Sequence, residues 1–260
     1  TIQDSEKLFL IGPRRYGKTT ILHAARQQCE ARGGRVIYLN AEAYNNRGIA
    51  YNDKDLYDQA IFDYNKALEI NSRYAEAYNN RGLAYRHKGE YDQAISDYNK
   101  ALEINPNLAG AYCGRGNYYY KKGEYDHAIS NYKKALEINP KDTKAYNNRG
   151  NAYAQKGEYD LAISDYNKAL EINPKDDVYY NNRGAAYHKK RQYDQAISDY
   201  NKALEINPRL AESYFKKALA CEEIGLKREA VEAYKAFIQY APPQYASYIE
   251  HARRKIMELG

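Results

Sequence analysis

The sequence has no tryptophan, a single methionine and only three cysteines in 260 residues. Cys29, Cys113 and Cys221 lie far apart, and none has a Cys or His at metal-ligand spacing. We therefore expect neither a disulfide framework nor a metal site. This cysteine usage is typical of a reducing compartment, so we expect a cytoplasmic protein. No apolar run approaches the roughly 20 residues that cross a bilayer, so we predict no membrane-spanning segment and no membrane partner.

Charge is nearly balanced over most of the chain. The formal net charge is +6, yet residues 41–244 carry 30 basic and 29 acidic residues. A nearly neutral surface argues against a large nucleic-acid-binding face. Tyrosine supplies nearly all of the aromatic content, with 31 residues against four phenylalanines.

Internal repetition with a period of 34 residues dominates the sequence. The string AYNNRG begins at Ala43, Ala77 and Ala145, and YNKALEIN begins at Tyr64, Tyr98, Tyr166 and Tyr200. A fixed period of this length indicates an array of stacked units. Six repeats follow from it: 41–74, 75–108, 109–142, 143–176, 177–210 and 211–244. Residues 1–40 precede the array and residues 245–260 follow it.

Each repeat has the spacing of two amphipathic helices. Tyr at position 4, Gly at 8 and Tyr at 11 share one face of a first helix, and positions 17, 20, 21, 24, 27 and 28 share one face of a second. Gly at position 8 and Ala at 20 let the two backbones approach where tyrosine rings interlock. Gly89, Gly123 and Gly157 at position 15 suit a left-handed end of the first helix, and Pro at position 32 ends the second.

This pattern resembles the tetratricopeptide repeat, with Tyr in place of the usual Trp at position 4 and of Phe at 24. The resemblance covers residues 41–244 and implies an all-α, right-handed solenoid of six antiparallel helix pairs with a concave groove. Such an array needs a polar-faced end cap, and we assign residues 245–260 to a capping helix, with Arg253, Arg254 and Lys255 mainly on its solvent side.

Residues 1–40 contain a different motif. Between predicted strands at 7–11 and 35–39, and before a predicted helix at 18–32, lies GPRRYGKT, which fits G-x-x-x-x-G-K-[ST]. It resembles the Walker A loop of prokaryotic AAA-like and signal-transducing NTPases. The resemblance implies nucleotide contacts at Gly12, Gly17, Lys18, Thr19 and Thr20, with Mg-ATP or Mg-GTP as the ligand and Thr19 as the Mg²⁺ ligand.

This β-α-β segment is too short for a complete nucleotide-binding domain. About 40 residues do not form an independent core, and we find no acidic Walker B strand and no catalytic base. We therefore favour the interpretation that this segment is a truncated remnant, or a cap packed on the first repeat, over functional nucleotide binding. We do not expect an enzyme.

The concave groove is the predicted ligand site. In the family the first helix of each pair lines it, with positions 2, 5, 6, 9, 12 and 13 pointing inward. Asparagine is a poor helix former, so its doubling at positions 5 and 6 in four repeats needs an explanation. A carboxamide both donates and accepts, and a row of them suits the backbone of an extended peptide. The predicted groove residues are Asn45, Asn46, Asn79, Asn80, Asn117, Tyr120, Asn147, Asn148, Asn151, Asn181, Asn182 and His188.

Two alternatives qualify this prediction. Recent duplication of a stable unit would also produce identical asparagines. The third repeat interrupts the row with Gly110, Cys113 and Gly114, which opens a pocket or reflects drift.

His188 and Lys189 contribute to a mildly basic rim, and if that rim matters, ligands should be weakly acidic.

The sequence thus predicts a non-enzymatic scaffold that binds an extended peptide or a partner protein. A nucleotide-gated switch, with the repeats as its sensor arm, is the alternative. RNA binding is weaker still, because the arginine at position 7 has acids at positions 18 and 23 of the same repeat with which to pair. Self-association through the ends of the array also remains open.

Overall fold

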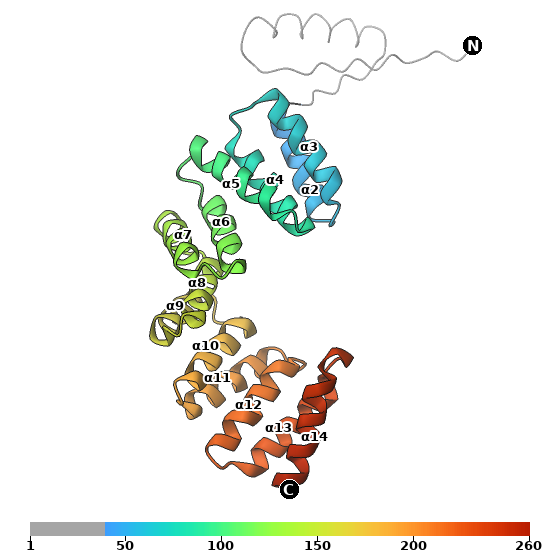
Figure 1. Ribbon diagram of the computed structural model, residues 1–260, viewed down its shortest axis with the longest axis vertical. Coiled ribbons are helices and arrows are strands. Elements are labelled where there is room, and N and C mark those ends of the chain that lie inside the picture. The colour runs from blue at the N-terminus through green and yellow to red at the C-terminus, as the bar shows by residue number, and fades with distance from the viewer. Residues whose placement is uncertain (1–39) are drawn as a thin grey trace, which may run out of the picture. The chain divides into compact units, whose positions relative to one another are not determined.

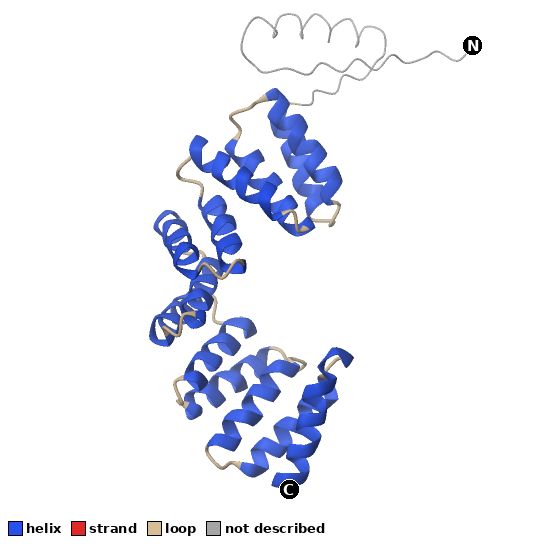
Figure 2. Ribbon diagram, viewed as in Figure 1, coloured by secondary structure: helices blue, strands red, loops and turns tan. Residues whose placement is uncertain are grey.

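A computed structural model describes residues 40–260, and every helix and turn below lies in that range. These residues form thirteen α-helices and one short 3-10 turn joined by short loops, with no strand among them (Figure 2). The all-α prediction is confirmed for the described residues. The predicted β-α-β segment of residues 1–40, including the loop of residues 12–19, lies almost entirely outside them.

The described residues fall into two compact units, which divide between Tyr118 and Tyr119. In the N-terminal unit, α2 packs against α3 and α4 against α5, and α3 packs on α4 (Figure 1). The helices are α2 (Ala41–Asn52), α3 (Tyr57–Ile70), α4 (Ala75–Lys88) and α5 (Tyr91–Ile104). The next helix, α6 (Ala109–Lys121), runs across the boundary between the units.

The C-terminal unit repeats the same arrangement. Each first helix packs on the second helix of its own pair and on the second helix of the pair before it. Its helices are α7 (Tyr125–Ile138), α8 (Thr143–Gln155), α9 (Tyr159–Ile172), α10 (Asp177–Lys189), α11 (Tyr193–Ile206), α12 (Ala211–Glu223), α13 (Lys227–Tyr240) and α14 (Ala246–Leu259).

A glycine and a tyrosine fix the close approach of the two helices where position 8 is glycine, as it is in every repeat but the last, which carries Ala218. A Cβ added at Gly150 would lie 2.8 Å from Cε1 of Tyr166, and one at Gly48 would lie 2.6 Å from Cε1 of Tyr64. Both tyrosines are 1 % exposed. This contact between position 8 and the tyrosine at position 24 agrees with the predicted close approach of the two backbones, and a Cβ at Gly48 or Gly150 would have to displace the ring.

Left-handed residues end the first helices, as predicted. Gly89, Gly123 and Gly157 have φ of 83°, 77° and 81°. Two repeats place a non-glycine residue at the same position, and Asp55 and Arg191 have φ of 58° and 60°. The turn thus imposes a left-handed conformation that costs an L-residue about 1–2 kcal/mol.

The capping helix α14 follows a 3-10 turn at Pro243–Tyr245 and packs on α13. Phe215 of α12 meets Tyr248 of α14 edge-on, with ring centroids 5.2 Å apart. Arg253 and Arg254 are exposed, as predicted for the outer face. Lys255 differs, because its side chain is 26 % exposed and its Nζ lies 2.7 Å from Glu222. No helix among residues 40–260 has the length and apolar character needed to cross a membrane.

Candidate functional site

Four of the arginines at position 7, Arg47, Arg81, Arg149 and Arg183, form ion pairs inside their own repeat, whereas Arg115 donates to Asn99 of the preceding repeat at 3.0 Å. Nε and Nη2 of Arg183 donate to the carboxylate of Asp199 at 2.8 and 2.6 Å, and Arg149 binds Asp165 in the same way. These aspartates are nearly buried, with side chains 6 % exposed. The bond to Asp199 raises the pKa of Arg183, so the cation is retained. A row of paired guanidinium groups offers little to RNA phosphates, which supports the sequence argument against RNA binding.

The paired asparagines bond to each other between successive repeats. Nδ2 of Asn80 donates to Oδ1 of Asn45 at 3.0 Å, and Nδ2 of Asn182 donates to Oδ1 of Asn147 at 2.9 Å. Each acceptor is at position 5 of one repeat, and each donor is at position 6 of the next. In the last repeat a serine donates instead of an asparagine: Oγ of Ser213 donates to Oδ1 of Asn181 at 2.9 Å.

Burial separates the two members of three of the four asparagine pairs, whereas Asn79 and Asn80 are both half-buried. Asn45, Asn147 and Asn181 at position 5 are 4 %, 8 % and 6 % exposed. Asn46 at position 6 is exposed. The remaining predicted groove residues are half-buried: Asn79, Asn80, Asn117, Tyr120, Asn148, Asn151, Asn182 and His188. Doubled asparagine thus has a use within the fold, and Asn45, Asn147 and Asn181 reach a ligand only by giving up a bond between repeats.

Three predicted residues come together in the C-terminal unit. Tyr120, Asn151 and Asn182 line a hollow of about 420 Å³ on the first helices of successive repeats, which we call the inner hollow. Its other polar side chains are Gln155, Lys189 and Lys216. Its remaining walls are tyrosines and alanines: Ala154, Tyr159, Tyr166, Ala185 and Ala186.

Hydrogen bonds hold part of this lining in place. The hydroxyl of Tyr166, a core residue, donates to Oδ1 of Asn151 at 2.7 Å. That bond uses Oδ1 of Asn151, and the Nδ2 group of this lining residue bonds no residue in the range 40–260, so it remains a donor for a ligand. Burial raises the pKa of the Tyr120 hydroxyl, so it stays protonated and can donate to a ligand. The inner hollow therefore offers fixed amide and hydroxyl groups beside an apolar floor.

His188 lies beside this hollow and does not line it. Its ring meets Tyr193 edge-on at 5.2 Å between centroids. Burial lowers the pKa of His188, the nearby Glu223 raises it, and Lys189 and Lys216 lower it further. The imidazole is therefore neutral near pH 7.

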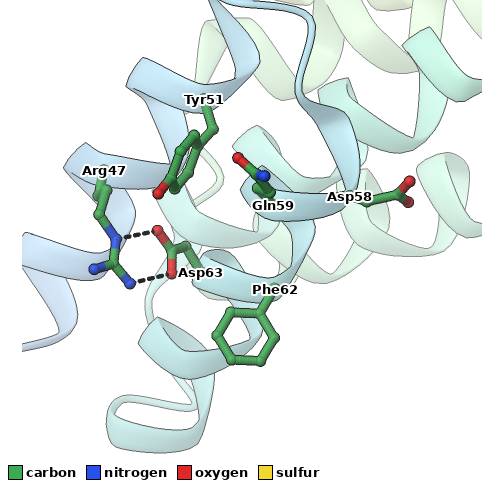
Figure 3. A pocket seen from close by; sticks show the side chains of 6 residues that line it. All are labelled: Arg47, Tyr51, Asp58, Gln59, Phe62 and Asp63. Carbon is green, nitrogen blue, oxygen red and sulfur yellow. Dashed lines mark hydrogen bonds and ion pairs between the residues drawn. The ribbon is translucent and has the colours of Figure 1, made fainter.

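A second hollow, of about 410 Å³, lies in the N-terminal unit (Figure 3). Its polar lining is dominated by the ion pair in which Arg47 binds Asp63 at 2.6 Å, and Phe62 and Asp58 point away from that pair (Figure 3). A third, of about 500 Å³, is lined by the equivalent residues of the next repeat, among them Arg81 and Asp97. In both, the strongest polar groups already satisfy each other.

Sequence reasoning missed two polar members of the inner hollow, Gln155 and Lys216. Both hold positions that the family resemblance directs inward, 13 and 6, but neither residue is repeated at its position in the array, so neither was included among the predicted groove residues. Lys216 occupies position 6 of the last repeat, which is asparagine in four others.

Comparison with known proteins identifies the class. Models of the tetratricopeptide repeat match residues 41–74, 75–108, 143–176, 178–210 and 211–244, and a TPR repeat model matches residues 116–157. The chain belongs to the tetratricopeptide-repeat family, a class of protein–protein interaction scaffolds. These matches begin at residue 41, so they give no support to the Walker A resemblance of residues 12–19.

Solved structures of the same fold include MamA, which is 30 % identical with a TM-score of 0.58, covering 61 % of this chain and 93 % of that one. YrrB, a TPR protein described as having an unusual peptide-binding site, is 25 % identical with a TM-score of 0.62, covering 74 % and 97 %. PilF of Pseudomonas aeruginosa is 19 % identical with a TM-score of 0.73, covering 83 % and 97 %, and shows the fold alone. A comparison with curated proteins found no match.

Proposed function

We propose that the protein is a non-enzymatic scaffold that binds an extended segment of a partner protein in the inner hollow. The observation that carries the proposal is the meeting of Tyr120, Asn151 and Asn182 from three successive repeats around one open hollow. Side chains spaced along successive helices suit a ligand that runs past them in an extended conformation.

The lining favours a polypeptide over a compact small molecule. Amide groups such as Nδ2 of Asn151 can bond the backbone of a segment, whatever its side chains. The alanines and tyrosines of the floor provide room and apolar surface for one side chain. YrrB, which is described as having a peptide-binding site, supports a ligand of this kind. Nucleotide binding at Lys18 stays a separate prediction, since residue 18 lies outside the described range.

Selection from a random peptide library on the immobilised full chain tests the proposal. The affinity of a selected peptide is then measured by fluorescence anisotropy for the wild type and for Asn151→Ala. Loss of one amide contact should weaken binding by about 1–3 kcal/mol. Asn46→Ala is the matched control, because Asn46 is an exposed first-helix asparagine that does not line the inner hollow.

Equal affinity for both variants, with unchanged circular dichroism, would remove the inner hollow from the binding site. Recovery of no binding peptide at all would contradict the proposed function.

A further inference from the structure

The first helix of the array, α2, has a face that no other helix among residues 40–260 covers. In the second repeat the preceding helix α3 packs on α4 and buries Ala77 and Ala84, at positions 3 and 10, completely. Ala43 and Ala50 hold the same positions in α2, where Ala43 is half-buried and Ala50 is exposed. We call this surface the open face and define it by Ala43, Arg47, Ala50 and Phe62.

The arginine of the open face lacks a partner that a preceding repeat supplies elsewhere. Nη1 of Arg183 donates to Oδ1 of Asn167, in the second helix of the preceding repeat, at 2.6 Å. Arg47 binds Asp63 through Nε and Nη2, and its Nη1 group bonds no residue in the range 40–260. Its side chain is 44 % exposed, against 20 % for Arg183. The open face therefore offers a donor to a segment that lies where a preceding second helix would lie.

Phe62 makes the open face more apolar than the same surface of later repeats. The ring is 57 % exposed and lines the hollow of Figure 3 together with Arg47. The equivalent residue in the next four repeats is serine: Ser96, Ser130, Ser164 and Ser198. Burial of the phenyl ring and of the neighbouring alanines favours an occupant with an apolar stripe.

The part of the chain that leads into α2 carries such a stripe. Residues 18–32 lie outside the described range, and their sequence predicts a helix. At 3.6 residues per turn, one side of that helix collects the residues Ile21, Leu22, Ala25 and Cys29. Gln28 flanks this stripe, and its side-chain oxygen is the same kind of acceptor that Asn167 provides to Arg183.

The connection is long enough for this segment to reach the open face. Residues 33–39 join it to Asn40, the N-cap of α2, and span about 23 Å when fully extended. The helix α2 has 12 residues and is about 18 Å long. Within the array, residues 71–74 alone make the corresponding connection between α3 and α4.

We propose that residues 18–32 dock as a helix on the open face of the same chain. The stripe covers Ala43, Ala50 and Phe62, and Gln28 accepts from Nη1 of Arg47. This docking closes the N-terminal end of the array, so that end does not serve self-association. The proposal is independent of peptide binding in the inner hollow, because it concerns a different surface.

Thiol labelling of the full chain tests the docking, since a docked stripe hides the thiol of Cys29. The rate of maleimide labelling is followed by mass spectrometry of the proteolytic fragment that contains Cys29. Ala50→Arg places a long cation on the open face and should raise that rate at least tenfold. Ile49→Arg is the matched control and should leave the rate unchanged, because Ile49 is 38 % exposed but lies about 100° further round α2.

Hydrogen exchange gives a second readout from the other side of the contact. The double variant Ile21→Asp plus Ala25→Asp places two charges in the stripe and should speed exchange of the α2 amides at least tenfold. His23→Asp plus Gln27→Asp places the same charges at the same spacing on the opposite side of the predicted helix, and should not.

Three results would overturn the proposal. The first is a Cys29 labelling rate that is equal in the wild type and in Ala50→Arg, with unchanged circular dichroism. The second is equal exchange of the α2 amides in the two double variants. The third is protection of Cys29 that grows with protein concentration, which would assign the open face to a second copy of the chain. Peptide selection on the inner hollow is judged separately and stands or falls on its own variants.

Discussion

The bond between asparagines of successive repeats gives the sharpest prediction about the fold. Asn182→Ala removes the donor that lies 2.9 Å from Oδ1 of Asn147. That oxygen belongs to a side chain only 8 % exposed, so water cannot easily replace the lost partner. An unsatisfied buried acceptor costs about 1–3 kcal/mol. Asn80→Ala should behave similarly, because Asn80 bonds Asn45 at 3.0 Å.

The control for this prediction is Asn46→Ala. Asn46 holds the same repeat position in the first repeat, is exposed, and bonds no residue in the range 40–260. Both substitutions gain roughly 0.5 kcal/mol of helix propensity, since alanine is the better helix former. The difference between Asn182→Ala and Asn46→Ala therefore isolates the bond between repeats, at about 1–3 kcal/mol.

Hydrogen exchange is the appropriate assay, because repeat arrays need not unfold in one step. The free energy of opening should fall for the amides of α8 and α10 in Asn182→Ala. If the amides of α8 and α10 are protected from exchange equally in both variants, the doubled asparagine does not stabilise the array. Duplication or ligand binding must then explain it.

Three further predictions concern the packing within a repeat. Gly150→Ala should destabilise the protein by about 1–3 kcal/mol, since its Cβ would lie 2.8 Å from the Tyr166 ring; an unchanged melting temperature would contradict the tight contact. Arg183→Met should cost about 3–5 kcal/mol in urea unfolding by leaving Asp199 buried and unpaired, and adding Asp199→Leu should restore much of the loss. Arg191→Gly should stabilise by about 1 kcal/mol, because φ is 60° there; a loss of stability would show that the arginine side chain outweighs the strain.

Much of the fold follows from spacing, because the repeated residues are the ones that pack. A glycine eight residues into each repeat and a tyrosine sixteen residues later predict a close helix pair, as at Gly150 and Tyr166. The arginine and aspartate sixteen residues apart predict the ion pair of Arg183 and Asp199 for the same reason. Each of these contacts lies within one repeat, at a separation that the helix geometry fixes.

The candidate site follows less directly. Adjacent asparagines such as Asn147 and Asn148 look alike in sequence, and only the packing of the next repeat decides which of the two is buried. The partner of Asn147 is 35 residues away, at Asn182. Lys216 was missed although position 6 was expected to face the groove, because a residue that occurs once in an array does not appear in its period. The period reports the core, whereas the structure is needed to bring unrepeated residues such as Gln155 and Lys216 together.

The most direct measurement of the central claim is site-specific photo-crosslinking of a selected peptide to the full chain. A photoreactive phenylalanine analogue replaces Tyr120 in the inner hollow or, as the control, Leu161, an exposed residue of the second helix α9. The account predicts a crosslink from residue 120 that excess unlabelled peptide suppresses, and none from residue 161. Crosslinking from residue 161 alone, with an intact fold, would place the ligand away from the inner hollow and contradict the account.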